Sequence, residues 1–342
     1  MTRIPVALYG AAGYGGQELL RLLANHPGLR VAVATSQRHA GRAVEAVLPQ
    51  LDGFFPDLAF QSPEESPAKT CRAVLLATPH GISHRLFATL VERDPELRVV
   101  DLSGDFRLQD EARFQAAYGA QRHLPAAAAD FAYGCTETNR DAIRCARWVA
   151  NPGCFATGAI LALAPLAGRG LLEGDVTLAQ TTGSSGSGAD PKPATHHPER
   201  AQDMRAYKVL AHQHEPEVAQ ELERLGAGGF DLAMVPQSGP FTRGIFTVAS
   251  VRVDEAVDVE ALYRERFSGE RFVRLRPDTP TLRHVVRTNF CDLSVHRRNG
   301  RVVVLTAIDN LGKGMASQAI QNLNLILGLD EAAGLFAPGA NP

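Results

Sequence analysis

The amino-acid sequence predicts an α/β protein in two parts: a doubly wound parallel sheet, then an α+β domain with a mostly antiparallel or mixed sheet. Two observations predict this fold class. The first 35 residues run from an apolar strand through a glycine-rich turn and an amphipathic helix into a second strand, the βαβ unit of parallel sheets. From about Val176 onward, strands follow one another with fewer helices between them. The length of 342 residues fits two domains.

The N-terminal domain is expected to cover residues 1–150 as a Rossmann-type fold, because strands and helices alternate along it. Its strands are expected at Ile4–Tyr9, Arg30–Thr35, Ala73–Ala77 and Arg98–Leu102, and its helices at Glu18–Asn25, Ser83–Arg93 and Glu111–Tyr118.

The second domain is expected to cover residues 151–312. Residues 313–330 are predicted to form a helix with Ile320, Leu323 and Leu327 on one stripe, which packs back onto the first domain. The strands of the second domain are expected at Val176–Thr181, Asp231–Pro236, Ile245–Val253 and Arg301–Ile308.

Charge and cysteine content narrow the function classes. Lys and Arg number 35 against 37 Asp and Glu, so a net charge of −2 predicts no overall attraction to nucleic acid or to an anionic membrane. The uncharged stretch 148–168 contains Asn151, Pro152 and Pro165, which favours a buried turn and helix over a membrane span. Five cysteines without a Cys-x-x-Cys pair, and an N-terminus without a signal-peptide pattern, indicate a cytoplasmic protein.

A nucleotide site is predicted at the first turn, which lies between a strand and a helix. Small residues there let backbone N–H groups approach a pyrophosphate at the positive end of the helix. The spacing G-x-x-G-x-G-G departs from G-x-G-x-x-G, so a plain tight turn remains the alternative. The candidate cofactor-binding residues of this turn are Gly10, Ala12, Gly13, Tyr14, Gly15 and Gly16.

The end of the second strand favours NADP over NAD. Ala34-Thr-Ser-Gln-Arg38 contains no acidic residue that would bind a ribose 2′-hydroxyl. Ser36 and Arg38 could instead hold a 2′-phosphate.

Cys154 is the candidate nucleophile. It follows an Asn-Pro-Gly turn and precedes a helical run. A thiol at a helix N-terminus has a lowered pKa, and the free N–H groups there could serve as an oxyanion hole. The alternative is a buried structural cysteine, which suits Cys71, Cys145 and Cys291. A thiolate beside a nicotinamide site suggests an enzyme that interconverts an acyl phosphate and an aldehyde through a thioester.

The sequence around this thiol resembles a known family. Asn151-Pro-Gly-Cys-Phe-Ala-Thr-Gly158 is similar to the signature of the N-acetyl-γ-glutamyl-phosphate reductases of arginine biosynthesis. The resemblance extends over nearly the whole chain, through segments 10–16, 78–81, 101–108, 211–217, 242–244 and 307–314.

The resemblance implies an NADPH-dependent reductase with a small-molecule acyl phosphate substrate, and a homodimer or homotetramer. Residues 1–150 would bind NADP(H), and residues 151–312 would form the catalytic and dimerisation domain. The resemblance also implies that Thr78, Pro79 and Asn310 lie at the cofactor and that Asn151 belongs to the substrate site.

The histidines of Ala211-His-Gln-His-Glu-Pro-Glu217 are further candidates. The chemistry needs a group that manages the thiol proton and protonates an oxyanion, and imidazole suits that role. The resemblance assigns this role to the His-x-His segment; we expect His212 as the base with His214 in support, on an extended or loop segment. A zinc site that joins these histidines, His196, His197 and Cys154 is a less favoured alternative, because zinc would compete for the thiolate.

Other polar residues are candidates for the substrate and cofactor. Arg107 with Ser103 could hold the departing phosphate, and Arg243 the substrate carboxylate, although most arginines are surface charges. The Gly/Ser segment 181–188, with Gly186, is expected to close over the nicotinamide and the substrate rather than to form a linker.

Three alternatives remain open. Thr195–Arg200 and Arg205–Tyr207 look more like the sister enzyme that reduces a carrier-protein-linked α-aminoadipyl or glutamyl phosphate, which would add a carrier protein as partner. An aspartate-semialdehyde dehydrogenase is more distant, because of the His-x-His segment. A nucleotide-binding sensor would need neither the thiol nor the base.

Overall fold

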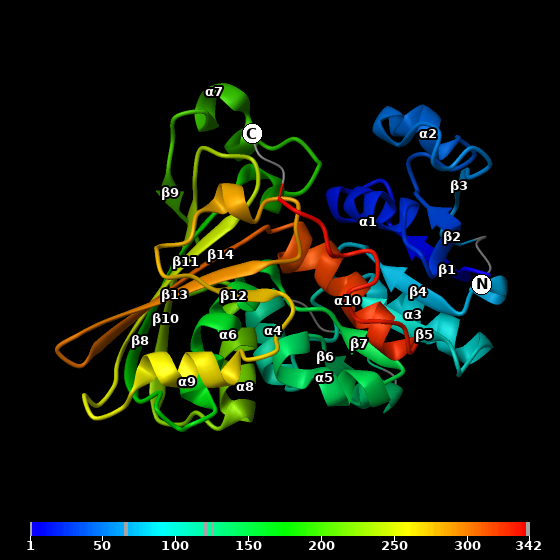
Figure 1. Ribbon diagram of the computed structural model, residues 1–342. Helices are drawn as coiled ribbons and strands as arrows, with labels where there is room; N and C mark the ends of the chain where they lie inside the picture. The colour runs from blue at the N-terminus through cyan, green and yellow to red at the C-terminus, as the bar shows by residue number, and fades with distance from the viewer. Residues whose placement is uncertain (1, 65–67, 120–121, 123, 125, 340–342) are drawn as a thin grey trace. The chain divides into compact units, whose positions relative to one another are not determined.

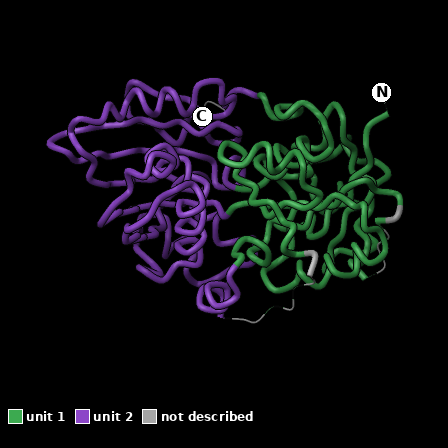
Figure 2. The backbone as a smooth tube through the Cα atoms, turned by 90° about the horizontal axis from the view of Figure 1, so that it is seen from below, with its two compact units in different colours: residues 1–109, 120–152, 315–336 green, residues 110–119, 153–314, 337–342 purple. Residues whose placement is uncertain are grey.

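The computed structural model describes residues 2–64, 68–119, 122, 124 and 126–339. The chain divides into two compact units, shown in two colours in Figure 2. Unit 1 contains residues 1–109, 120–152 and 315–336, and unit 2 contains residues 110–119, 153–314 and 337–342. The helix α4 (Glu111–Tyr118), expected in the first domain, therefore groups with unit 2.

Unit 1 is built on a seven-stranded parallel sheet in the order β3-β2-β1-β4-β5-β7-β6 (Figure 1). This confirms the predicted doubly wound class. The order reverses between β1 and β4, so the loops that follow these two strands diverge there. The strands are β1 (Ile4–Tyr9), β2 (Leu29–Thr35), β3 (Phe60–Gln61), β4 (Ala73–Leu76), β5 (Arg98–Asp101), β6 (Ala132–Tyr133) and β7 (Trp148–Ala150).

The helices of unit 1 join and cover these strands. Edge-to-face aromatic contacts support the core: the ring of Phe87 lies 5.1 Å from Phe106 and 5.0 Å from Trp148. The helices are α1 (Tyr14–Ala24), α2 (Val44–Val47), α3 (Ser83–Arg93), α5 (Thr136–Cys145) and α10 (Ser317–Ile326), with short 3-10 turns at Pro49–Leu51, Ala68–Thr70 and Ala126–Asp130.

Two helices differ from their expected form. Helix α1 begins at Tyr14, four residues before the expected Glu18, because the glycines themselves form its first turn. Helix α10 follows a π-helical turn (Gly312–Ala316), and all ten of its residues are buried, not only the expected apolar stripe. Several of its polar side chains form hydrogen bonds inside unit 1; the Asn322 amide, for example, donates to the Gly134 carbonyl oxygen at 2.8 Å.

Unit 2 is built on a mixed sheet, as predicted, and its strand order is β12-β13-β14-β11-β8-β10-β9. The pairs β8–β10 and β12–β13 are parallel, and the other neighbours are antiparallel. The strands are β8 (Gly174–Thr182), β9 (Arg205–Ala206), β10 (Phe230–Ser238), β11 (Ile245–Arg252), β12 (Val273–Leu275), β13 (Cys291–Arg298) and β14 (Arg301–Ile308).

One face of this sheet packs on α6 (Cys154–Ala167), whose residues from Phe155 onward are all buried. Gly158 permits the close approach, since a Cβ there would lie 2.9 Å from the Thr247 hydroxyl oxygen. Among the described residues, no helix is long and apolar enough to cross a membrane. The other helices of unit 2 are α7 (His197–Arg200), α8 (Glu215–Leu225) and α9 (Val259–Arg266), with 3-10 turns at Ser184–Ser187, Pro193–Thr195 and Leu282–His284.

Candidate active site

Cys154 is the first residue of α6, and Gly153 is the helix N-cap in an extended conformation. The thiol therefore lies where the helix presents N–H groups without intrahelical partners, and where the helix dipole favours a thiolate. The other side of the residue is closed by backbone, because a Cβ on Gly314 would lie 3.0 Å from the Cys154 Cβ. Cys154 is partly exposed, whereas Cys71, Cys135 and Cys291 are buried. Cys145, expected to be buried, is exposed at the end of α5.

Both predicted histidines lie beside this thiol. A Cβ on Gly153 would lie 2.5 Å from His214 Nε2, so the His214 ring covers the residue before Cys154. The Phe155 ring, on the residue after Cys154, lies 5.2 Å from the His212 ring. The two imidazoles are 4.7 Å apart. Of the two expected settings, an extended segment or a loop, the structure shows the loop: His214 has helical backbone angles and caps α8, so a turn brings the rings together.

The hydrogen bonding of His212 indicates which proton it carries. Its Nδ1 accepts the His214 backbone N–H at 3.2 Å. A neutral imidazole that accepts at Nδ1 carries its proton on Nε2 and donates there. Burial, together with the nearby Lys208 ammonium, lowers the pKa of His212 to about 4. His212 is therefore neutral at pH 7, with its Nδ1 lone pair occupied and an N–H available at Nε2. The role of general base stays a prediction.

The sequence interpretation missed two residues of this site. The buried Glu217 carboxylate accepts the Gly153 backbone N–H at 2.7 Å and so fixes the turn that precedes the thiol. Tyr207 packs edge-on to His212, with the rings 5.8 Å apart. Burial, and secondly the Cys154 thiolate charge, raise the pKa of the Tyr207 hydroxyl well above its usual range. The sequence did carry a signal for Glu217, because this carboxylate lies in the first turn of the helix that begins directly after the His-x-His segment.

The predicted nucleotide turn lies in unit 1 at the switch point of the sheet. Gly10 has a φ of +78°, and a Cβ there would lie 2.3 Å from the Ala77 carbonyl oxygen, in the loop after β4. A Cβ on Gly16 would lie 2.4 Å from the Gly10 carbonyl oxygen, whereas Gly13, the N-cap of α1, meets nothing closer than 3.7 Å. The turn thus packs tightly at Gly10 and Gly16 and leaves room at Gly13, the N-cap of α1, which is the position that the sequence predicted for a pyrophosphate.

The neighbouring candidates lie around the same edge of the sheet. Ser36 and Arg38 follow β2, with Ser36 buried and Arg38 exposed. Thr78 and Pro79 follow β4, and the Thr78 hydroxyl is hydrogen-bonded to the Ser83 hydroxyl at 2.8 Å. With Ala12, Tyr14 and Gly15 in the first turn, these residues surround the carboxyl ends of β1, β2 and β4.

The Gly/Ser segment is a folded turn. Ser184 and Ser185 donate their backbone N–H groups to Phe241 and Thr242, at 2.9 and 3.0 Å. The buried Asn310 amide links the Gly/Ser turn to the segment that precedes β11. It donates to the Ser185 hydroxyl at 2.9 Å and accepts the Gly244 N–H at 2.7 Å. This shapes the turn around Gly186 and favours a structural role for Asn310 over the expected contact with the cofactor.

Three other candidates, Arg107, Ser103 and Asn151, form hydrogen bonds within unit 1. The buried Arg107 guanidinium donates to the backbone oxygens of Asn151 at 2.8 Å and Leu102 at 2.7 Å, and the Ser103 hydroxyl donates to Asp101 at 2.7 Å. The fully buried Asn151 amide donates to the Met315 carbonyl and accepts from Asn322, both at 3.1 Å. These side chains hold strand ends together, which disfavours the expected phosphate and substrate roles.

Arg243 is positioned by an ion pair and remains partly accessible, which suits a contact with the substrate. Its guanidinium pairs with the buried Asp309 carboxylate at 2.9 Å, and 16% of the side chain remains exposed. The histidines of the zinc alternative do not gather around the thiol turn as a metal site. His196 and His197 are exposed, at the start of α7. Among the described residues, no group of three or more His, Cys, Asp or Glu side chains is arranged to hold a metal ion.

Two family models match this chain, one over each of two successive stretches. Residues 5–146 match the family described as "Semialdehyde dehydrogenase, NAD binding domain", and residues 154–310 match "Semialdehyde dehydrogenase, dimerisation domain". The nicotinamide-binding match covers the glycine turn, and the second match begins at Cys154.

Full-length relatives are more specific. The N-acetyl-gamma-glutamyl-phosphate reductase of Ectopseudomonas mendocina is 42% identical over 97% of this chain and 98% of its own. The protein of that name from Methanocaldococcus jannaschii is 41% identical over 98% and 99%. Among solved structures, aspartate semialdehyde dehydrogenase II of Vibrio cholerae has a TM-score of 0.72 at 16% identity, covering 96% of this chain and 99% of that one, which shows a shared fold.

Proposed function

This chain belongs to the N-acetyl-γ-glutamyl-phosphate reductase family, and from that membership we propose that it reduces N-acetyl-γ-glutamyl phosphate to N-acetylglutamate 5-semialdehyde and phosphate in arginine biosynthesis. The observation that carries the proposal is the arrangement in unit 2: a cysteine at the start of a buried helix, with two adjacent imidazoles beside it. This arrangement suits acyl transfer to sulfur.

The reaction begins at the Cys154 thiolate, which the N-terminus of α6 favours. The sulfur attacks the acyl carbon, the bond from that carbon to the phosphate oxygen breaks, and phosphate leaves with its electron pair. The nicotinamide cofactor, when bound, supplies the hydride that reduces the resulting thioester. The His212 Nε2–H donates a hydrogen bond to the oxygen that gains negative charge, and His214 keeps the His212 ring in place. Collapse of the hemithioacetal then restores the thiolate and releases the aldehyde.

We propose NADPH as the reductant. The open N-terminus of α1 at Gly13 suits the pyrophosphate, and Ser36 with Arg38 suits a 2′-phosphate in the absence of an acidic residue at the end of β2. Unit 1 would then be the NADP-binding domain and unit 2 the catalytic and dimerisation domain. Arg243, held by Asp309, is the candidate for the substrate carboxylate.

We propose that a second copy of the chain covers the outer face of the unit 2 sheet. Gln180, Thr247 and Thr306 point toward α6 or contact it, so their strand neighbours point the other way. These neighbours are largely apolar and half-buried: Ala179, Phe246, Val248 and Leu305. Such a face suits a homodimer or a homotetramer of a cytoplasmic enzyme.

The reverse reaction tests the proposed substrate. The parent protein should reduce NADP⁺ when given N-acetylglutamate 5-semialdehyde and phosphate, and Cys154→Ser should not. A parallel assay with a carrier-linked aminoadipate semialdehyde tests the alternative activity, that of the sister enzyme with a carrier-linked substrate, which segments 195–200 and 205–207 suggest. Activity with the carrier-linked substrate alone would overturn the proposed substrate while leaving the thioester chemistry in place.

A further inference from the structure

A row of arginines lies along the amino-terminal edge of the unit 1 sheet, opposite the edge that carries the nucleotide turn. Each of five adjacent strands has an arginine at or next to its start. In the spatial order β2, β1, β4, β5, β7 these residues are Arg30, Arg3, Arg72, Arg98 and Arg147. The ladder joins two of them directly, since the Arg98 N–H bonds to the Arg72 carbonyl oxygen at 3.3 Å.

Adjacent parallel strands are about 4.8 Å apart, so this row brings like charges close together. Among the residues that the structure describes, Arg147 is the member of the row with a carboxylate partner, Glu96 at 3.1 Å. Within the described part of the chain, the guanidinium groups of the other four residues form no ion pair. Against these five arginines stand the carboxylates of Asp94 and Glu96, which line the same edge, so a local excess of positive charge remains in a protein of net charge −2.

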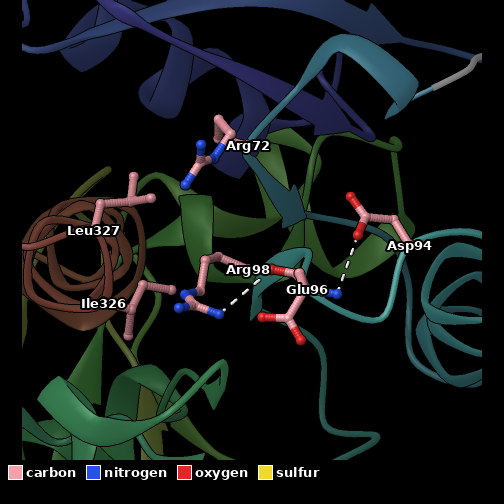
Figure 3. Close-up of a pocket in the computed structure, with 6 residues that line it drawn as sticks. All are labelled: Arg72, Asp94, Glu96, Arg98, Ile326 and Leu327. Atoms are coloured by element: carbon pink, nitrogen blue, oxygen red, sulfur yellow. Dashed lines mark hydrogen bonds between the residues drawn. The ribbon is translucent and has the colours of Figure 1, made fainter.

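Two adjoining cavities lie between this row and the end of α10. Arg72 and Arg98, with Asp94 and Glu96, line the first, of about 520 Å³. Figure 3 shows the side chains of Arg72 and Arg98 extending toward Ile326 and Leu327, while Asp94 lies farther away. The second cavity, of about 430 Å³, is lined by Arg3 and Arg30 and shares Arg72 and Leu327 with the first.

We propose that these cavities form a binding site for a small oligophosphate anion, distinct from the nucleotide turn and from the thiol. Guanidinium groups bind phosphate oxygens through paired N–H donors, and several of them side by side match an anion that carries several charges. The apolar wall at Ile326 and Leu327 lowers access of water to one side of the site. Four guanidinium groups shared between two adjoining cavities favour a chain of phosphoryl groups over a single phosphate.

Tripolyphosphate is the probe, with binding measured by calorimetry at fixed ionic strength and with saturating NADPH to block the nucleotide turn. The parent protein should bind it saturably. Arg72→Gln with Arg98→Gln should weaken binding at least about tenfold, because charge-assisted hydrogen bonds are lost. The matched control, Arg85→Gln with Arg93→Gln, removes the same charge from exposed positions on α3 outside the cavities and should bind as the parent does.

Asp94→Asn provides a test with the opposite sign. It removes a negative charge that lines the cavity while its side-chain oxygen can still accept the Glu96 N–H, so it should tighten binding. The proposal is overturned if the parent shows no saturable binding, or if both double variants lose affinity equally. It is also overturned if Arg72→Gln with Arg98→Gln lowers only the thermal unfolding temperature, since the arginines would then serve the C-terminal end of α10.

Discussion

Replacement of Gly153 by alanine should damage catalysis through the His214 ring. Gly153 has ordinary extended backbone angles (φ −65°, ψ 149°), so alanine brings no backbone strain of its own. Its Cβ, however, would lie 2.5 Å from Nε2, 2.6 Å from Cε1 and 2.7 Å from Cδ2 of His214. Contact between such atoms needs about 3.5 Å, so the ring or the thiol turn must move by about 1 Å.

The surroundings leave little room for that movement. His214 is only 7% exposed, and its ring lies 4.7 Å from His212 and 6.1 Å from Phe155. Overpacking of this kind costs about 1–3 kcal/mol of unfolding free energy. A displacement of about 1 Å within a catalytic arrangement can cost about 10²-fold in rate. We therefore expect kcat/KM to fall about 10²-fold while the protein remains folded.

The assay follows NADPH oxidation with the acyl phosphate, and denaturant unfolding gives the stability. The rate of Cys154 alkylation reports the thiol turn independently of turnover. Gly228→Ala is the matched control, because it adds the same methyl group where nothing lies within 4 Å. Parent-like activity and alkylation in Gly153→Ala would show that His214 does not confine the thiol turn, and would refute the reasoning.

The remaining predictions concern the thiol, His212 and the cofactor. Cys154→Ser should abolish turnover with NADPH binding nearly unchanged in a fluorescence titration; activity above a few per cent of the parent would remove the thiol from the mechanism. His212→Asn should lower kcat about 10²–10⁴-fold, the usual range for a proton-handling group, and an effect on KM alone would contradict this role. Because burial lowers the pKa of His212 to about 4 from 6.5, the unfolded chain binds the proton first, so stability is lost as the pH falls from 6.5 toward 4. Urea unfolding across that range should show a smaller loss in His212→Asn than in the parent. Arg38→Ala should raise the KM for NADPH and leave that for NADH unchanged; equal use of both cofactors by the parent would contradict the assignment.

The features of this protein that were predictable from sequence are those that depend on local chemistry. The strand Ile4–Tyr9 and the helices Ser83–Arg93 and Glu111–Tyr118 have the predicted bounds, because their apolar spacing and end residues are contained in the segments themselves. Cys154 could be placed at a helix N-terminus for the same reason, since the Asn-Pro-Gly turn stops one element and the next run starts a helix.

Tertiary structure decided which polar side chains are available for chemistry. Arg107 was a candidate by residue type, and Asn151 and Asn310 were candidates through the family resemblance. Their side chains are nevertheless engaged by groups distant in the chain, such as Ser185 for Asn310. Glu217 joins the thiol turn through a hydrogen bond to Gly153 that spans 64 positions.

The arginine row likewise could not be predicted from the sequence, because it is formed by residues from five separate segments. Arg3, Arg30, Arg72, Arg98 and Arg147 are scattered through the first 147 residues, and no spacing in the sequence connects them. They become neighbours only through the strand order β2-β1-β4-β5-β7. That order depends on backbone pairing between distant segments. The sequence by itself determined which residues begin the strands, whereas the pairing of the strands determined which charges lie side by side.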